Sequence, residues 1–177
     1  MEKLKNKIAQ EDIELAKRVH YGFLPDGYED EMLDVSIKMI AHDQLGGDYC
    51  GVFPVDDDHV IASICDASGH GIASALYAAR INTFVLSHVQ LIHNPCELIT
   101  KMNAFFCQHM AITNMQCSFF ILIFDKKNYT VSYAGAGHPA VIRFNSRTED
   151  IEFLESSTTL IGIQDPLIVE CQSQKLQ

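Results

Sequence analysis

The feature that most constrains this chain is a predicted β-hairpin with an acidic residue at each outer end. Two runs that favour β-structure, Tyr49 to Val55 and His59 to Cys65, are joined by a turn of consecutive aspartates. A hairpin of this length brings its outer ends together, so Asp48 and Asp66 are predicted to be neighbours in space. Two carboxylates at one end of a hairpin can hold a hard cation.

Each acid admits two interpretations. Aspartate is a common turn former and helix cap, a role that needs no ligand. Magnesium and manganese prefer oxygen ligands, and one or two carboxylates can anchor them while water fills other positions. Asp48 and Asp66 suit this second role, and the backbone carbonyl of Ala67 could add a neutral oxygen.

Glycine-rich turns flank the two acids. Gly46 and Gly47 precede the first acid, and the turn 68–71 follows the second. Glycine lets the backbone approach ions and phosphate closely, and it equally serves tight turns at strand ends. A nucleophilic pair of Ser68 and His70 is disfavoured, because the sequence supplies no clear orienting acid. The residues expected beside a bound phosphate are Gly47, Ser68, Gly69 and His70.

The segment from Tyr133 to Ala140, with sequence YAGAGHPA, is a second glycine-rich patch. Its glycines satisfy a GxGxxA dinucleotide fingerprint, but Pro139 and a β-like run follow where a phosphate-binding helix would begin. We therefore interpret the patch as a connection between strands. His138 would either stabilise this loop near the site or take part in the site's chemistry.

Hydrophobic periodicity predicts the other elements. Residues 3–22 form an amphipathic helix, which either packs on the domain or serves dimerisation or regulation. Two helices, from Gly69 to about His93 and from about Pro95 to Met110, follow the hairpin. The further predicted strands are Leu33–Ala41, Gln116–Phe124, Tyr129–Ala134, Ala140–Phe144, Ile151–Leu154 and Leu167–Cys171. This order indicates an α/β sandwich of mainly antiparallel sheets with helices outside.

Composition narrows the class. With 177 residues, 47% hydrophobic and 20% charged, the chain is predicted to fold around a real core. The net charge of −10 argues against non-specific nucleic-acid binding. The longest apolar run, Phe119 to Phe124, is far shorter than a membrane helix, and Met1 leads directly into charged sequence, so no signal peptide is expected. The cysteines lack a CxxC pair, which favours reduced thiols in a cytoplasmic protein over a disulfide or a zinc site.

The order and spacing of these motifs resemble those of the metal-dependent PPM (PP2C-like) protein serine/threonine phosphatases. The most similar branch is the bacterial one typified by SpoIIE and RsbU. The resemblance begins at Gly46-Gly47-Asp48, continues from Asp66 to Gly71 at the start of an alanine-rich helix, and includes the AGHP segment around His138. It extends over nearly the whole chain.

The resemblance implies a four-layered αββα sandwich of two mainly antiparallel sheets flanked by helices, with the metal site at one end of the facing sheets. An N-terminal linker or regulatory helix over residues 1–25 would precede a phosphatase core over residues 26–177. Asp66 would be the central carboxylate of the metal pair, Ala67 the carbonyl ligand, and Asp48 a direct or indirect ligand of the same cluster.

The resemblance also implies an activity and a partner. The reaction would be hydrolysis of phosphoserine or phosphothreonine on a protein, typically a small STAS-domain anti-sigma-factor antagonist, in bacterial cytoplasmic signal transduction. Two Mn²⁺ or Mg²⁺ ions would activate a bridging water for attack at phosphorus. No nucleic-acid or membrane partner is expected, and a homodimer could form through the N-terminal helix.

The sequence departs from the family pattern at its C-terminal end. Family members continue into a T-D-G-like motif and a later aspartate, which supply metal ligands, and neither occurs before Gln177. We therefore expect a C-terminally incomplete domain with an open sheet edge, few or no bound ions and slow turnover. The alternative to an enzyme is a weak or inactive binding module. An unrelated α/β sensor domain would require Asp48 and Asp66 to lie far apart.

Overall fold

The computed structural model describes residues 2–40, 45–88, 91 and 93–176, with side chains from residue 10 onward in these ranges. The helices are α1 (Glu2–Tyr21), α2 (Ile72–Ser87), α3 (Pro95–Met110) and the short 3-10 helix η2 (Ala111–Thr113). The strands are β1 (Gly27–Glu29), β2 (Asp34–Ser36), β3 (Asp48–Pro54), β4 (His59–Ala67), β5 (Cys117–Asp125), β6 (Thr130–Ala136), β7 (Val141–Asn145), β8 (Asp150–Leu154) and β9 (Gln172–Lys175).

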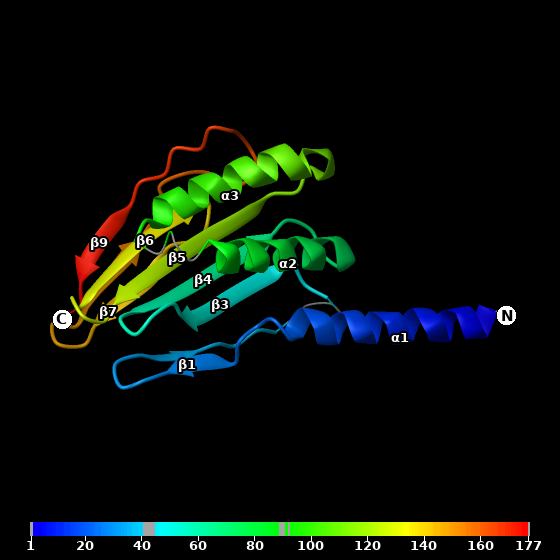
Figure 1. The fold of residues 1–177 in the computed structure, drawn as a ribbon, viewed down its shortest axis with the longest axis horizontal. Coiled ribbons are helices and arrows are strands. Elements are labelled where there is room, and N and C mark those ends of the chain that lie inside the picture. The colour runs from blue at the N-terminus through cyan, green and yellow to red at the C-terminus, as the bar shows by residue number, and fades with distance from the viewer. Residues whose placement is uncertain (1, 41–44, 89–90, 92, 177) are drawn as a thin grey trace.

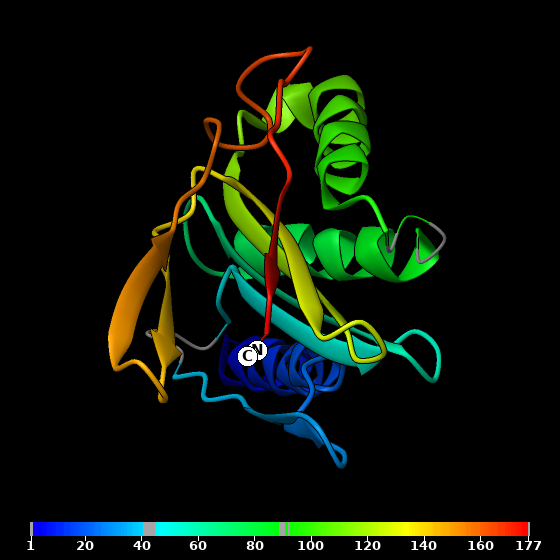
Figure 2. The same cartoon turned by 90° about the vertical axis from the view of Figure 1, so that its left-hand side faces the viewer.

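A five-stranded antiparallel sheet organises the fold. Its strand order is β3-β4-β5-β6-β9. The helices α2 and α3 lie on one side of this sheet, and the β7-β8 hairpin stands on the other side (Figures 1 and 2). The β1-β2 hairpin lies beside β3, below the sheet in Figure 1.

Side-chain alternation along the central strands builds an apolar cluster on each face of the sheet. Phe119 and Ile121 of β5 belong to the large core that α2 and α3 complete. Phe120, Tyr133 and Leu154 form a smaller cluster between the sheet and the β7-β8 hairpin. The unbroken apolar run of β5 is therefore explained by burial on both faces.

The predicted fold class is confirmed, because helices and mainly antiparallel sheets pack as an α/β structure. Within the described residues, the layer opposite α2 and α3 consists of the separate two-stranded hairpin β7-β8 (Figure 2). Apolar side chains on β7 and β8 remain exposed, as expected of a layer that is only partly covered in this part of the chain. These side chains are Ile142, Phe144, Ile151 and Phe153.

Predicted boundaries agree with the structure where local capping signals are strong. Asn94 caps α3 by accepting a hydrogen bond from the Glu97 N–H at 3.0 Å, and Pro95 begins the helix as predicted. The strand predicted over Leu33–Ala41 is wrong beyond Ser36, where β2 ends. Ala41, the last residue of that predicted strand, lies outside the described residues.

The strand predicted over Leu167–Cys171 is also wrong. The final strand β9 begins at Gln172 and pairs with β6. Leu167 is instead buried in the core on the helix side, and Cys171 is bonded to Cys96 of α3. Contact with α3 therefore keeps this segment away from the sheet until β9.

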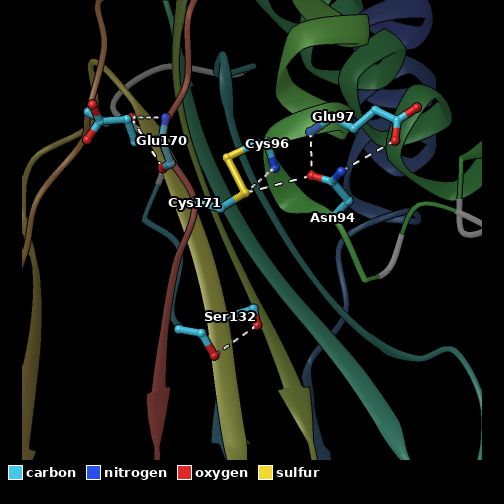
Figure 3. The surroundings of a disulfide bond; sticks show 8 residues. Asn94, Cys96, Glu97, Ser132, Glu170 and Cys171 are labelled. Carbon is cyan, nitrogen blue, oxygen red and sulfur yellow. Dashed lines mark hydrogen bonds between the residues drawn. A yellow bond between two sulfur atoms is a disulfide. The ribbon is translucent and has the colours of Figure 1, made fainter.

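A disulfide joins Cys96 at the start of α3 to Cys171 just before β9 (Figure 3). The Cys96 N–H also donates to the Cys171 sulfur at 3.1 Å. This bond corrects the expectation that the thiols are reduced. It closes a separation of 75 residues, which no local cysteine spacing reveals. The free cysteines are Cys50, Cys65, Cys107 and Cys117.

Large apolar side chains of helix α1 are exposed to solvent. Leu15 is 54% exposed and Val19 is 67% exposed, whereas His20 at the next position is buried. The predicted amphipathic helix therefore exists, but part of its apolar face is uncovered. In the described part of the chain, no helix is both long enough and apolar enough to cross a membrane.

Candidate functional site

Polar side chains form a row across three neighbouring strands at one end of the five-stranded sheet. Asp48 on β3 is the register partner of Asp66 on β4, and Asp66 is the register partner of Ser118 on β5. The adjacent residues Tyr49 and Cys65 belong to the core on the helix side, so alternation places the row on the opposite face. The prediction that the two acids are neighbours is confirmed. The alternative of an unrelated sensor domain, which required them to lie far apart, is therefore wrong.

The two carboxylates interact mainly with each other. Burial raises the pKa of Asp48 above its ordinary value, and the charge of Asp66 and a hydrogen bond to it raise that pKa further. Among the described residues, no lysine or arginine forms an ion pair with either acid. A bound divalent cation would relieve this repulsion.

A pocket of about 120 Å³ opens beside the acid pair. Its lining includes the turn 46–47, the turn residues 69–70 and His20 at the end of α1. A Cβ on Gly47 would lie 2.8 Å from Ser74 Cβ and 2.9 Å from the carbonyl oxygen of Ala67. Gly47 is therefore required for the close approach of these segments, and the Ala67 carbonyl faces the turn that precedes Asp48.

The turn after Asp66 keeps its backbone open. Gly69 and Gly71 have φ angles of 88° and 80°, and a Cβ on either would meet no described residue within 4 Å. These glycines therefore serve the backbone conformation and not close packing. Ser68 Oγ accepts a hydrogen bond from the Gln116 N–H at 3.0 Å, which ties the turn to the start of β5. His70 lines the pocket.

His138 lies in the loop between β6 and β7, and a strand follows it where a dinucleotide-binding motif would have a helix. Its Nδ1 atom is 2.7 Å from Ser118 Oγ. Burial lowers the pKa of His138, and the negative charge of Asp66 partly opposes this shift. His138 is thus connected to the acid row through Ser118, which the sequence analysis did not single out.

His20 is a second pocket residue that the sequence analysis missed. Its side chain is 4% exposed, and its Nδ1 atom has no hydrogen-bond partner among the residues that the structure describes. Burial lowers the pKa of this imidazole, and the ring packs edge-on to Phe23 at a centroid distance of 5.0 Å. A histidine at the end of an amphipathic helix carries no signal that it will face an acidic pocket.

The arrangement offers oxygen ligands for a hard cation. The carboxylates of Asp48 and Asp66 and the carbonyl of Ala67 suit Mg²⁺ or Mn²⁺, which keep several water ligands. Among the described residues, no group of three or more His, Cys, Asp or Glu side chains could hold a metal ion. The donor chemistry therefore fits a divalent cation that is anchored by few protein ligands and retains much of its water.

Comparison with known proteins shows which family this chain resembles. Residues 56–177 match the family described as stage II sporulation protein E (SpoIIE), a range that contains Asp66 and His138. The phosphoserine phosphatase RsbP of Bacillus subtilis (strain 168) is 24% identical over 171 residues. That alignment covers 93% of this chain but only 41% of RsbP, so the chain spans less than half of this relative.

Solved structures share the fold at low sequence identity. The SiaA-PP2C domain of Pseudomonas aeruginosa gives a TM-score of 0.79 at 16% identity, over 100% of this chain and 70% of that one. RsbX in complex with magnesium gives 0.71 at 14% identity, over 85% and 72%. These likenesses establish a PP2C-like fold. With the match over residues 56–177, they show that the chain belongs to the SpoIIE family.

Proposed function

We propose that this protein is a metal-dependent serine/threonine phosphatase that hydrolyses phosphoserine or phosphothreonine on a protein substrate. The observation that carries this proposal is the pairing of Asp48 with Asp66 beside a pocket lined by glycine turns. Membership of the SpoIIE family and similarity to a phosphoserine phosphatase support it. The magnesium in the RsbX structure supports Mg²⁺ or Mn²⁺ as the cofactor.

A divalent cation, when bound, supplies Lewis-acid activation of water and neutralises phosphoryl oxygens. The chain's own residues hold and orient the reactants. Asp48 and Asp66 would anchor the cation, and Ala67 would add a carbonyl oxygen. The turns at Gly47 and Gly69 add no side chain to the pocket wall, so a phosphoryl group can approach the backbone closely at these two positions.

The protein substrate that we propose is a STAS-domain anti-sigma-factor antagonist in the bacterial cytoplasm. Similarity to RsbP supports a phosphorylated protein as substrate. The net charge of −10 disfavours a nucleic-acid partner. Incubation with a serine-phosphorylated STAS protein, followed by phosphate-affinity electrophoresis, tests the assignment. A STAS protein that keeps its phosphate, while an unrelated phosphoprotein loses it, would contradict the assignment.

We propose that the first 25 residues form a regulatory segment whose helix α1 contacts a second copy of the chain. Leu15 and Val19 of α1 line an apolar groove of about 300 Å³ together with Ile72 and Leu76 of α2. His20 lines both this groove and the acidic pocket, so a shift of α1 would alter the pocket wall. Sedimentation analysis should give a dimer that Val19→Glu dissociates, and a monomeric wild-type protein would contradict this contact.

The second candidate function is a weak or inactive module that binds a phosphorylated partner without efficient turnover. It is favoured by the lack, in the described part of the chain, of any cluster of three or more metal-ligating side chains. A calorimetric titration with manganese should then show weak binding. Tight binding of two ions would contradict this second function.

Hydrolysis of p-nitrophenyl phosphate separates the two candidates. The enzyme predicts product that depends on manganese and disappears with EDTA or with Asp66→Asn. The binding module predicts no product, while a phosphoserine peptide still binds. A protein that releases no product and also binds no phosphoserine peptide would contradict both candidates.

A further inference from the structure

Hydrogen bonds fix both the backbone and the ring of the partly buried loop residue His138. Its backbone N–H donates to Ser156 Oγ at 3.0 Å, and Ser156 Oγ donates to the His138 carbonyl at 2.8 Å. Ser118 Oγ contacts Nδ1 of the ring at 2.7 Å. Both the backbone and the ring of His138 are therefore fixed by serine hydroxyls.

The loop around His138 is also closely packed against the segment that follows β8. A Cβ on Gly135 would lie 2.5 Å from Ser156 Oγ, so only glycine fits there. Gly137 has a φ angle of 59°, and its N–H donates to the Thr158 carbonyl at 2.8 Å. These contacts set where the imidazole begins, and Ser118 then sets how the ring is turned.

The hydrogen bonds of Ser118 bear on which ring nitrogen of His138 carries the proton. A hydroxyl has one proton to donate and two lone pairs that accept. Ser118 Oγ accepts from the Asp66 N–H at 3.2 Å, and the described structure gives it only His138 Nδ1 as an acceptor. Donation of the Ser118 proton to Nδ1 would leave the proton of a neutral His138 on Nε2.

We propose that Ser118 is a positioning residue that holds His138 in the Nε2–H form, so that Nε2 donates a hydrogen bond to the phosphate ester bound beside Asp66. This inference rests on the proposed phosphatase function. The ring is linked to Asp66 by two consecutive hydrogen bonds through Ser118, which places it next to the acid row. Ser118 is itself no nucleophile, because it is 7% exposed and its hydroxyl is already engaged on both sides.

The protonated nitrogen can be measured without any activity. Long-range ¹H–¹⁵N spectra of histidine-labelled protein should show the Nε2–H form of His138 in the wild type. Ser118→Ala should give a mixture of forms, and Ser118→Thr, which keeps the hydroxyl, should restore the wild-type signal. Ser63→Ala is the matched control, because it removes another buried strand hydroxyl, bonded to Tyr49 Oη at 3.3 Å. It should leave the His138 signal unchanged.

Inorganic phosphate added with manganese tests the contact itself. The Nε2 resonance should shift in the wild type and not in Ser118→Ala, and kcat/KM for a phosphoserine peptide should fall about 10- to 100-fold in that variant. A wild-type ring in the Nδ1–H form, or one that Ser118→Ala does not affect, would overturn the proposal even if hydrolysis persists. An inactive wild type that keeps both the Nε2–H form and the phosphate shift would refute the catalytic function but support the positioning role.

Discussion

The two ends of the five-stranded sheet both carry aspartates, but these acids have opposite surroundings. At the hairpin-turn end, Asp30 accepts hydrogen bonds from Lys126 Nζ at 2.8 Å and from Tyr28 Oη at 2.6 Å. These contacts, first that with Lys126, hold the pKa of Asp30 well below its usual range. Hydrogen bonds from His59 and from Asn128 likewise lower the pKa values of Asp56 and Asp125, respectively.

At the other end, Asp48 faces Asp66, and burial together with that neighbour raises its pKa. Aspartate therefore plays two different physical roles in this protein. Acids that are satisfied by donors and cations stabilise turns, whereas acids that face each other without a cation cost stability unless a ligand arrives. The contrast indicates which aspartates serve the fold and which serve the site.

The largest expected effect comes from exchanging one acid at each end. Asp66→Asn should lower manganese-dependent hydrolysis of a phosphoserine peptide by about 100-fold or more, because it removes an anchoring carboxylate. Asp125→Asn is the matched control and should leave hydrolysis within about twofold, since in the described part of the chain Asp125 bonds turn groups and His59. Equal losses of activity in both variants would contradict the distinction between the aspartates at the two ends.

The disulfide contains none of these aspartates. Removing it therefore tests the stability of the fold apart from the chemistry of the site. Cys171→Ser should lower the free energy of unfolding by about 2–4 kcal/mol, because the Cys96–Cys171 bond no longer restricts the unfolded chain. Urea denaturation with and without a reducing agent measures this effect, and Cys107→Ser is the control with a free thiol. A wild-type curve that does not respond to reductant would contradict the bond.

Neighbouring glycines at the site end give a smaller, matched comparison. Gly47→Ala should cost about 1–3 kcal/mol, because its Cβ would crowd Ser74 and the Ala67 carbonyl. Gly46→Ala should change the free energy of unfolding by less than about 0.5 kcal/mol, since its Cβ would meet no atom of the described residues closer than 3.9 Å. Gly47→Ala should also weaken manganese binding, measured by calorimetry. Equal behaviour of the two variants would show that the Ala67 carbonyl is not confined by this turn.

The smallest effects are changes of stability with pH, and they should have opposite signs at the two ends. Asp30 has a lowered pKa when folded, so its stabilising contribution exists above the unfolded pKa of about 4 and is lost as pH falls. Asp48 has a raised pKa, so its ionised form costs stability and the cost disappears as pH falls through that folded pKa.

Urea midpoints of two variants measure these opposite contributions. At pH 7 and without metal, Asp30→Asn should lower the midpoint, and Asp48→Asn should raise it. The Asp48→Asn difference should shrink as pH falls through the raised folded pKa of Asp48. The Asp30→Asn difference should shrink only at lower pH, as pH falls from about 4 towards the depressed folded pKa of Asp30. Shifts of the same sign at pH 7 would contradict the contrast.

Local signals in the sequence were sufficient for the hairpin, the meeting of Asp48 with Asp66 and the start of α3 at Pro95. Each depends on residues close together in the chain, namely a short turn or a helix cap. Ser118, His20 and the Cys96–Cys171 bond could not be predicted in this way. Their partners are distant in the chain, so their positions follow only from the β4-β5 register, the docking of α1 and the path of the segment after β8.

The central claim is that the acid pair at one end of the sheet binds the divalent cation. Titration of ¹⁵N-labelled protein with substoichiometric Mn²⁺ tests it most directly, because the paramagnetic ion broadens nearby amide signals even when binding is weak. The account predicts selective broadening at Asp48, Asp66 and Ala67 that Asp66→Asn abolishes. Broadening centred on Asp56 to Asp58 at the opposite end, or unchanged by Asp66→Asn, would contradict it.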